Sequence, residues 1–67
     1  MDREERREIF RAVRLEIGMS QGELGKCMGI KASDISALET GRGGRAPTRV
    51  HMRFLELIKL TNNAGLI

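Results

Sequence analysis

The sequence contains few aromatic residues: Phe10 and Phe54 are the only ones, and neither tryptophan nor tyrosine occurs. A hydrophobic core must therefore be built from Ile, Leu, Val and Met, which suits short helices in close contact. We expect residues 1–67 to form one domain, near the lower size limit for a self-sufficient core. Such a core alone contributes about 3–5 kcal/mol of stability, so dimerisation would help considerably.

Cysteine and histidine are also scarce, with one of each. The single Cys27 cannot form an internal disulfide, and no His/Cys cluster is available for zinc. We interpret Cys27 as a small apolar or partly exposed residue of a reduced, intracellular protein rather than as a redox-sensing thiol. His51 is interpreted as an exposed surface residue. Because the sequence offers no nucleophile–base set and no convergent pair of acids, neither an enzyme nor a cofactor is expected.

Long apolar runs are missing. No segment approaches the ~18 residues that a membrane-spanning helix needs, and the charged N-terminus lacks the apolar segment of a signal peptide. We therefore expect a cytoplasmic protein without a membrane partner.

Acidic residues are absent from residues 41–49, which contain three arginines. The net charge of the whole chain is only +3, and most of this excess comes from that stretch because charges nearly balance elsewhere. A polyanionic partner would explain a loop of uncompensated arginines.

Apolar residues recur at helical spacing in four segments, which predicts an all-α fold. The first helix is expected over residues 2–17, with Asp2 near its start and Gly18 at its end. Its apolar stripe consists of Ile9, Phe10, Val13 and Ile17. The Glu and Arg residues between them are interpreted as a solvated face, from which one arginine is available to contact phosphate.

The second helix is expected to start at Ser20, because Glu23 follows at the spacing of a capping box. Leu24 and Met28 are four residues apart and face inward, and Gly29 ends the helix. Gly25 is costly inside a helix, which suggests that a side chain there would collide with a neighbouring helix.

The third helix is expected over residues 32–40, with Ile35 and Leu38 buried and Gly41 at its end. Ser33, Asp34, Ser36 and Ala37 are expected to point outward. The fourth helix is expected over residues 49–60, entered through Pro47 and Thr48. Its expected core stripe consists of Val50, Phe54, Leu57 and Ile58. Residues 61–65 break the helical pattern.

Residues 9–58 resemble the lambda-repressor-like (Cro/repressor, XRE) family of helix-turn-helix DNA-binding proteins. The resemblance rests on Arg14, Gly18-Met19-Ser20-Gln21, Leu24-Gly25, Gly29-Ile30 and the run from Ile35 to Gly41. It implies a compact domain of four to five helices, the third of which enters the major groove of DNA. Position 25 departs from the family, which usually has alanine there.

The resemblance assigns ten residues to the DNA-binding face: Ser20, Gln21, Lys31, Ala32, Ser33, Asp34, Ser36, Ala37, Arg42 and Arg45. Gln21 should donate to a phosphate, and the two arginines should lie on the DNA backbone. Ala37 should lie near the groove floor. Arg14 and Glu39 should form a partly buried ion pair.

The residue types agree with these roles, since small side chains let a helix approach the base edges closely. Lys31 is the best candidate for contacting guanine. Direct readout should otherwise be weak, so the shape of the DNA would supply part of the specificity. Ser33 and Ser36 have a simpler interpretation as solvent-facing or capping residues. Asp34 is unusual near DNA; it would cap an amide, accept from cytosine N4 or repel wrong sequences.

These observations predict a homodimeric transcriptional repressor that binds double-stranded DNA at an inverted repeat in its own operon's promoter. Many relatives have a fifth helix and a further domain where this chain ends, so no small-molecule effector is expected. Apolar residues in excess of one small core are expected at the dimer interface. They are Leu57, Leu60, Leu66 and Ile67, with Leu55 as a further candidate. The alternative function is an antitoxin-type module that neutralises a partner protein and binds DNA secondarily.

Overall fold

The computed structural model describes residues 1–65, and within this part the chain forms four α-helices and no strand. Leu66 and Ile67, which were expected at the dimer interface, lie outside the described residues. The helices are α1 (Arg3–Ile17), α2 (Gln21–Met28), α3 (Ala32–Thr40) and α4 (Arg49–Asn63), with a 3₁₀ turn η1 (Arg42–Gly44) between α3 and α4. The all-α prediction is confirmed.

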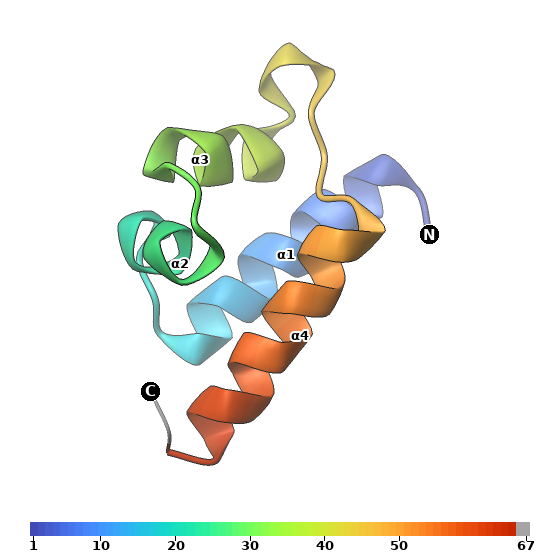
Figure 1. Ribbon diagram of the computed structural model, residues 1–67. Helices are drawn as coiled ribbons and strands as arrows, with labels where there is room; N and C mark the ends of the chain where they lie inside the picture. Colours follow the sequence, from blue (N-terminus) through green and yellow to red (C-terminus); the bar gives the residue numbers. More distant parts are fainter. Residues whose placement is uncertain (66–67) are drawn as a thin grey trace.

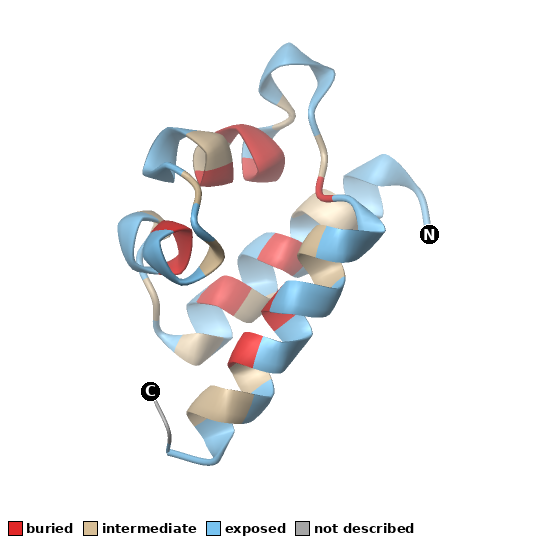
Figure 2. Ribbon diagram, in the orientation of Figure 1, coloured by how far each residue is buried: buried red, intermediate tan, exposed pale blue. Residues whose placement is uncertain are grey.

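The helices form two pairs that share one core. α1 and α4 lie side by side, while α2 packs against α3 above the C-terminal end of α1 (Figure 1). Buried segments of all four helices turn toward the centre of the molecule (Figure 2). The core cluster of buried residues consists of Phe10, Leu24, Ile35, Leu38, Leu55 and Ile58. None of the helices within residues 1–65 combines the length and the apolar character that crossing a lipid bilayer requires.

Local hydrogen bonds define where the helices begin. The Oγ of Ser20 accepts from the backbone N–H of Glu23 at 3.1 Å, and the carboxylate of Glu23 accepts from the N–H of Ser20 at 2.9 Å. Asp2 caps α1 in the same reciprocal way with Glu5. Thr48 caps α4, so the three predicted starts are confirmed.

Gly25 is required by the turn between α2 and α3. A Cβ added there would lie 2.6 Å from the carbonyl oxygen of Ile30 and 3.4 Å from the backbone nitrogen of Ala32. The expected steric conflict is therefore real, but the obstacle is the backbone of the adjoining turn and not a neighbouring helix. The missing side chain lets α3 start close beside α2.

The prediction for α4 was wrong in its length and in its buried face. The helix continues to Asn63, three residues beyond the expected end. Leu55 and Ile58 are buried, whereas Val50, Phe54 and Leu57 are 74%, 39% and 54% exposed. The helix carries two adjacent apolar stripes, and packing against α1 selects the one that contains Leu55. Leu55 was expected as a further candidate for the dimer interface, and this was wrong because the residue is part of the buried core.

Candidate nucleic-acid interface

Arg14 and Glu39 form a buried ion pair that joins α1 to α3. Nε of Arg14 donates to Oε2 of Glu39 at 2.7 Å and Nη2 donates to Oε1 at 3.0 Å. The two residues are only 7% and 8% exposed. Nη1 of Arg14 also donates to the carbonyl of Met19 at 2.9 Å, so the same guanidinium fixes the segment that leads into α2. This bidentate arrangement sets the position of α3 relative to α1 and α2.

Gln21 joins this cluster from the first position of α2. Its Nε2 donates to Oε1 of Glu39 at 3.2 Å, and the residue is half-buried. An amide nitrogen carries two hydrogens, so one remains for a phosphate. Ser20 is exposed, and its hydroxyl oxygen is used to cap α2.

The exposed part of α3 is its first turn. Lys31, Ala32 and Ser33 are exposed, and Ser36 is half-buried one turn later. These side chains are short except for Lys31, which stands at the N-terminal end of the helix. The sequence-predicted residues thus come together as a narrow ridge that can enter a groove.

Ala37 does not belong to this ridge, because it is 5% exposed. Its assignment to the groove floor was wrong. Ile35, Leu38 and Glu39 are also buried, so the C-terminal half of α3 is enclosed on more than one side. The methyl side chain of Ala37 is too short to reach the surface past these neighbours.

Asp34 is held by Arg45, which explains an acid on this face. Nη1 of Arg45 donates to Oδ1 of Asp34 at 2.8 Å, and this bond is the main cause that lowers the pKa of Asp34. The other carboxylate oxygen accepts from the N–H of Lys31 at 3.4 Å, which fits the capping alternative. The two paired side chains are 44% and 36% exposed. The pair therefore links the acid-free loop to the first turn of α3.

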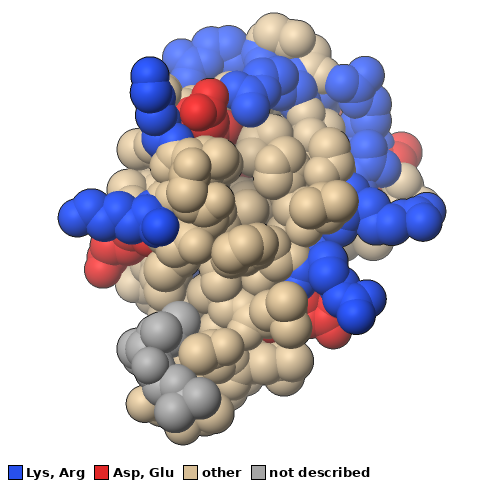
Figure 3. Space-filling view, in the orientation of Figure 1, with Lys and Arg blue, Asp and Glu red and all other residues tan. Residues whose placement is uncertain are grey.

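Arg42 is exposed and also turns back to α3. Its Nη2 donates to the carbonyl of Ser33 at 3.4 Å. Lys and Arg side chains gather over the loop that follows α3, at the top of the molecule in Figure 3. The lower part of this face is mainly uncharged.

Three arginines of α1 contact the same loop, which the sequence did not predict. Nε of Arg7 donates to the carbonyl of Arg45 at 2.8 Å, and Nε of Arg6 donates to the carbonyl of Pro47 at 2.8 Å. Nη2 of Arg3 donates to the carbonyl of Gly44. These arginines were expected on a solvated face. The sequence did contain an indication of a shared position. Arg6 and Arg7 follow Arg3 by three and four residues, and residues at these spacings lie on one side of a helix.

An exposed apolar ridge follows α4, beginning directly after the basic loop. We call it the α4 ridge; it consists of Val50, Phe54, Leu57 and Leu60. Leu57 and Leu60, both expected at a dimer interface, are 54% and 58% exposed. Grooves of about 330 and 300 Å³ lie along the ridge, and Cys27 of α2 borders the second.

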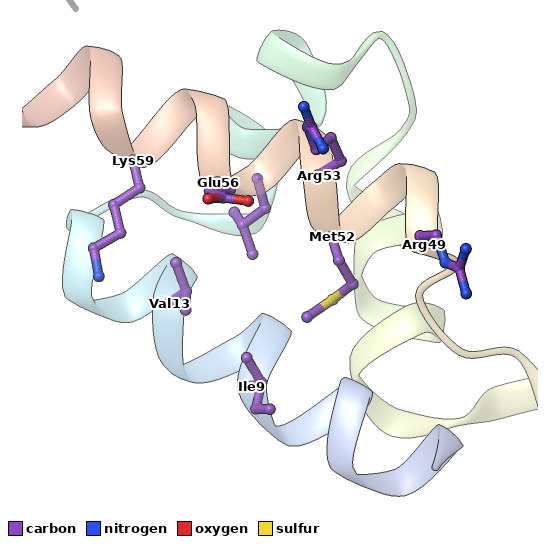
Figure 4. Close-up of a pocket in the computed structure, with 8 residues that line it drawn as sticks. Ile9, Val13, Arg49, Met52, Arg53, Glu56 and Lys59 are labelled. Atoms are coloured by element: carbon purple, nitrogen blue, oxygen red, sulfur yellow. The ribbon is translucent and has the colours of Figure 1, made fainter. Parts of the chain in front are cut away.

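A further groove of about 390 Å³ separates α1 from α4 (Figure 4). Its floor is apolar and includes Ile9, which is 39% exposed although it was expected in the core. The lining is completed by Val13, Arg49, Met52, Arg53, Leu55, Glu56 and Lys59. It includes neither His nor Cys, and Glu56 is its one acid. Elsewhere in residues 1–65, no three His, Cys, Asp or Glu side chains are grouped to hold a metal ion.

The chain was compared with models of protein families, with curated protein sequences and with solved structures. None of the three comparisons found a match.

Proposed function

We propose that this protein is a transcriptional repressor of the lambda-repressor-like helix-turn-helix type, acting in the cytoplasm on an operator in its own operon's promoter. One observation carries the proposal. The exposed first turn of α3, which has mainly short side chains, lies beside a loop that contains arginines and no acidic residue. The buried ion pair between Arg14 and Glu39 supports it, because it fixes α3 as a rigid reading element.

In this proposal the first turn of α3 enters the major groove. Lys31 donates to a guanine edge, and Ala32 contacts a thymine methyl group. The side chain of Ser33 is short enough for the backbone of α3 to approach the bases. Because few side chains make bidentate base contacts, much of the specificity comes from the local shape of the operator.

Phosphate contacts flank the recognition helix on both sides. On one side, the free N–H groups at the start of α2 and the second amide hydrogen of Gln21 point to the backbone. On the other side, Arg42 and Arg45 supply positive charge. Arg45 stays bonded to Asp34 through one nitrogen and has other guanidinium donors left for a phosphate.

The proposed DNA-binding form is a homodimer in which two α4 ridges pack antiparallel around a two-fold axis. The ridge residues recur every three or four positions, which is the spacing that lets two helices interdigitate. The grooves along the ridge can receive the side chains of a second copy. Two copies read an inverted repeat, and occlusion of the promoter then represses transcription without contact to the polymerase.

Selection of binding sites from random duplex DNA tests this function. We expect enrichment of an inverted repeat whose half-site centres lie about 10 bp apart. A Lys31→Ala variant should lose preference at one base position of each half-site, while a matched Lys26→Ala variant on α2 should select the same sequence as the parent. A selection that enriches no sequence over the starting pool would contradict the proposed function.

A further inference from the structure

We propose that Arg3 and Arg7 of α1 bind the DNA backbone together with Arg42 and Arg45. We call these four residues the arginine cluster. The inference rests on the proposed function and extends it, because it adds the N-terminal helix to the DNA-contacting surface.

The first argument is position. Arg3 and Arg7 are one helical turn apart, and their guanidinium groups reach the loop at the carbonyls of Gly44 and Arg45. Gly41 makes room for the second of them, because a Cβ on Gly41 would lie 2.8 Å from Cζ of Arg7. The two side chains are thereby fixed beside Arg45 and the C-terminal end of α3.

The second argument is charge. A backbone carbonyl is neutral, so the bonds to the loop leave both guanidinium charges uncompensated. The charges of residues 1–19 balance in the sequence, but they do not pair with each other in space. The three ion pairs in residues 1–65 join Arg14 to Glu39, Arg45 to Asp34 and Lys59 to Glu16. Asp34 is therefore the one carboxylate paired with the arginine cluster.

The third argument is donor capacity. A guanidinium carries five N–H donors in a planar fork that matches the oxygens of a phosphate. Arg3 and Arg7 each use one nitrogen on the loop. The carbonyl bonds remove the rotational freedom of these long side chains in advance, so that less conformational entropy is lost when a phosphate binds. The cluster is preorganised for a polyanion that runs past α3, which is the DNA backbone in the proposed complex.

The experiment is a salt titration of operator binding, followed by fluorescence anisotropy with the full chain. Each phosphate contact contributes about 0.9 to the slope of log K against log salt. In a dimer, Arg7→Gln should therefore make the slope shallower by about 1.8, and the double variant R3Q/R7Q by about 3.6. The control Lys26→Gln on α2 removes the same charge at an exposed position away from the cluster and should leave the slope unchanged.

Arg7→Lys separates phosphate binding from a role confined to holding the loop. Lysine retains the charge but has no Nε–H with which to reach the carbonyl of Arg45 in the same geometry. If Arg7 binds phosphate, R7K keeps most of the parental slope although its melting temperature falls. If Arg7 only holds the loop, R7K and R7Q lose affinity to the same extent, and their slopes stay parental. This comparison also decides the question if R3Q/R7Q fails to fold.

The possible failures are distinguishable. If the parent protein binds no duplex at low salt, the proposed function and this inference both fail. If the parent binds its operator and Arg42→Gln makes the slope shallower, while R3Q/R7Q leaves slope and affinity unchanged, only the inference fails. A shallower slope for R3Q/R7Q with parental helicity supports it.

Discussion

At the scale of single residues, the guanidinium of Arg14 joins three segments of the chain. It bonds to Glu39 in α3 and to the carbonyl of Met19 before α2, while its own helix is α1. Burial of such a pair costs desolvation energy, so its net contribution to stability is smaller than its geometry suggests. Removal of one partner is costly because the other charge stays buried.

We expect Arg14→Ala to lower the free energy of unfolding by about 3 kcal/mol, since it leaves Glu39 buried without a cation. The double variant Arg14→Met with Glu39→Leu should recover part of this loss. Urea denaturation followed by circular dichroism measures both effects. Arg11→Ala, an exposed position on the same helix, is the control and should change stability by less than about 0.5 kcal/mol. Equal stability of R14A and R11A would contradict the role of the pair.

His51 makes the cap of α4 sensitive to pH. Its Nδ1 accepts from the backbone N–H of Thr48 at 3.0 Å, which requires the unprotonated ring nitrogen. Desolvation by burial, and secondarily the nearby charge of Arg45, lower the pKa of His51 below its ordinary value of 6.5. The unfolded chain therefore takes up the proton first as the pH falls.

It follows that this contribution to stability is fully present above pH 6.5 and is lost as the pH falls through the lower pKa of the folded state. The melting temperature should decrease between pH 7.5 and pH 5. In His51→Gln the side-chain oxygen can still cap Thr48, and the decrease in this window should become smaller. The lowered pKa values of Asp2, Glu23 and Asp34 act only at more acidic pH, below ordinary values of 3.8 to 4.5. Identical pH profiles for parent and variant would rule out the histidine.

At the scale of elements, the turn between α2 and α3 depends on Gly25. Alanine has the higher helix propensity, but the added Cβ would meet the carbonyl of Ile30 at 2.6 Å, and backbone cannot move aside as a flexible side chain can. We expect Gly25→Ala to destabilise the fold by about 1–3 kcal/mol through overpacking.

Gly22→Ala is the matched control in the same helix. Its nearest neighbour, Oγ of Ser20, would lie 3.9 Å from the new Cβ, which is an ordinary contact. This change should stabilise α2 by up to about 1 kcal/mol. Thermal melts of the two variants should therefore shift in opposite directions, and a stabilised G25A would show that the turn can yield.

The elements differ in how much of them the sequence predicts. The starts at Ser20 and Thr48 were predictable because each is encoded by a few consecutive residues. Glu23 follows Ser20 at the spacing of a capping box, and Pro47 precedes the capping residue Thr48. The buried face of α4 was not predictable. Two apolar stripes of this helix have the same periodicity, and only the contact with α1 distinguishes the buried one. Ala37 was misplaced for a related reason: its exposure depends on what packs beside α3.

The candidate site was predictable where it is continuous in sequence. Lys31, Ala32 and Ser33 follow one another and stand together on the surface. The contribution of α1 was predictable only in part. The spacing of its arginines places them on one side of a helix, but nothing in the sequence shows that Arg3 and Arg7 reach a loop 38 to 41 residues away in the chain. The charges of residues 1–19 sum to zero along the sequence. This sum does not show that Arg3 and Arg7 lie beside the arginines of a distant loop in the folded chain.

At the scale of the whole molecule, Lys and Arg side chains gather over the loop that follows α3 (Figure 3), whereas the α4 ridge is an apolar row along α4. A dimer formed through the ridge would therefore leave the first turn of α3, which is proposed to contact DNA, free in both copies. An exposed apolar row on a chain this small is the feature that a second copy would cover.

We expect the parent protein to sediment as a dimer at micromolar concentration, and Leu57→Asp to sediment as a monomer with unchanged helicity and weaker operator binding. Leu15→Asp is the control, because Leu15 is similarly exposed, at 52% against 54%, but lies on α1. Cys27 provides a second readout: its thiol borders the ridge and should react more slowly with a thiol reagent in the dimer. A parent that stays monomeric at high micromolar concentration would contradict the ridge as an interface.

The bonds from α1 to the loop have a consequence for the order in which the molecule folds. The helix caps close within a few residues, whereas the loop from Gly44 to Pro47 is fixed by side chains 38 to 41 positions earlier. Contacts of such high sequence separation form late, since a long segment must first be closed. We therefore expect this loop, which is proposed to face DNA, to become ordered after the helix caps. Because residues 42–45 are exposed, we also expect it to open before the buried core when the folded protein fluctuates.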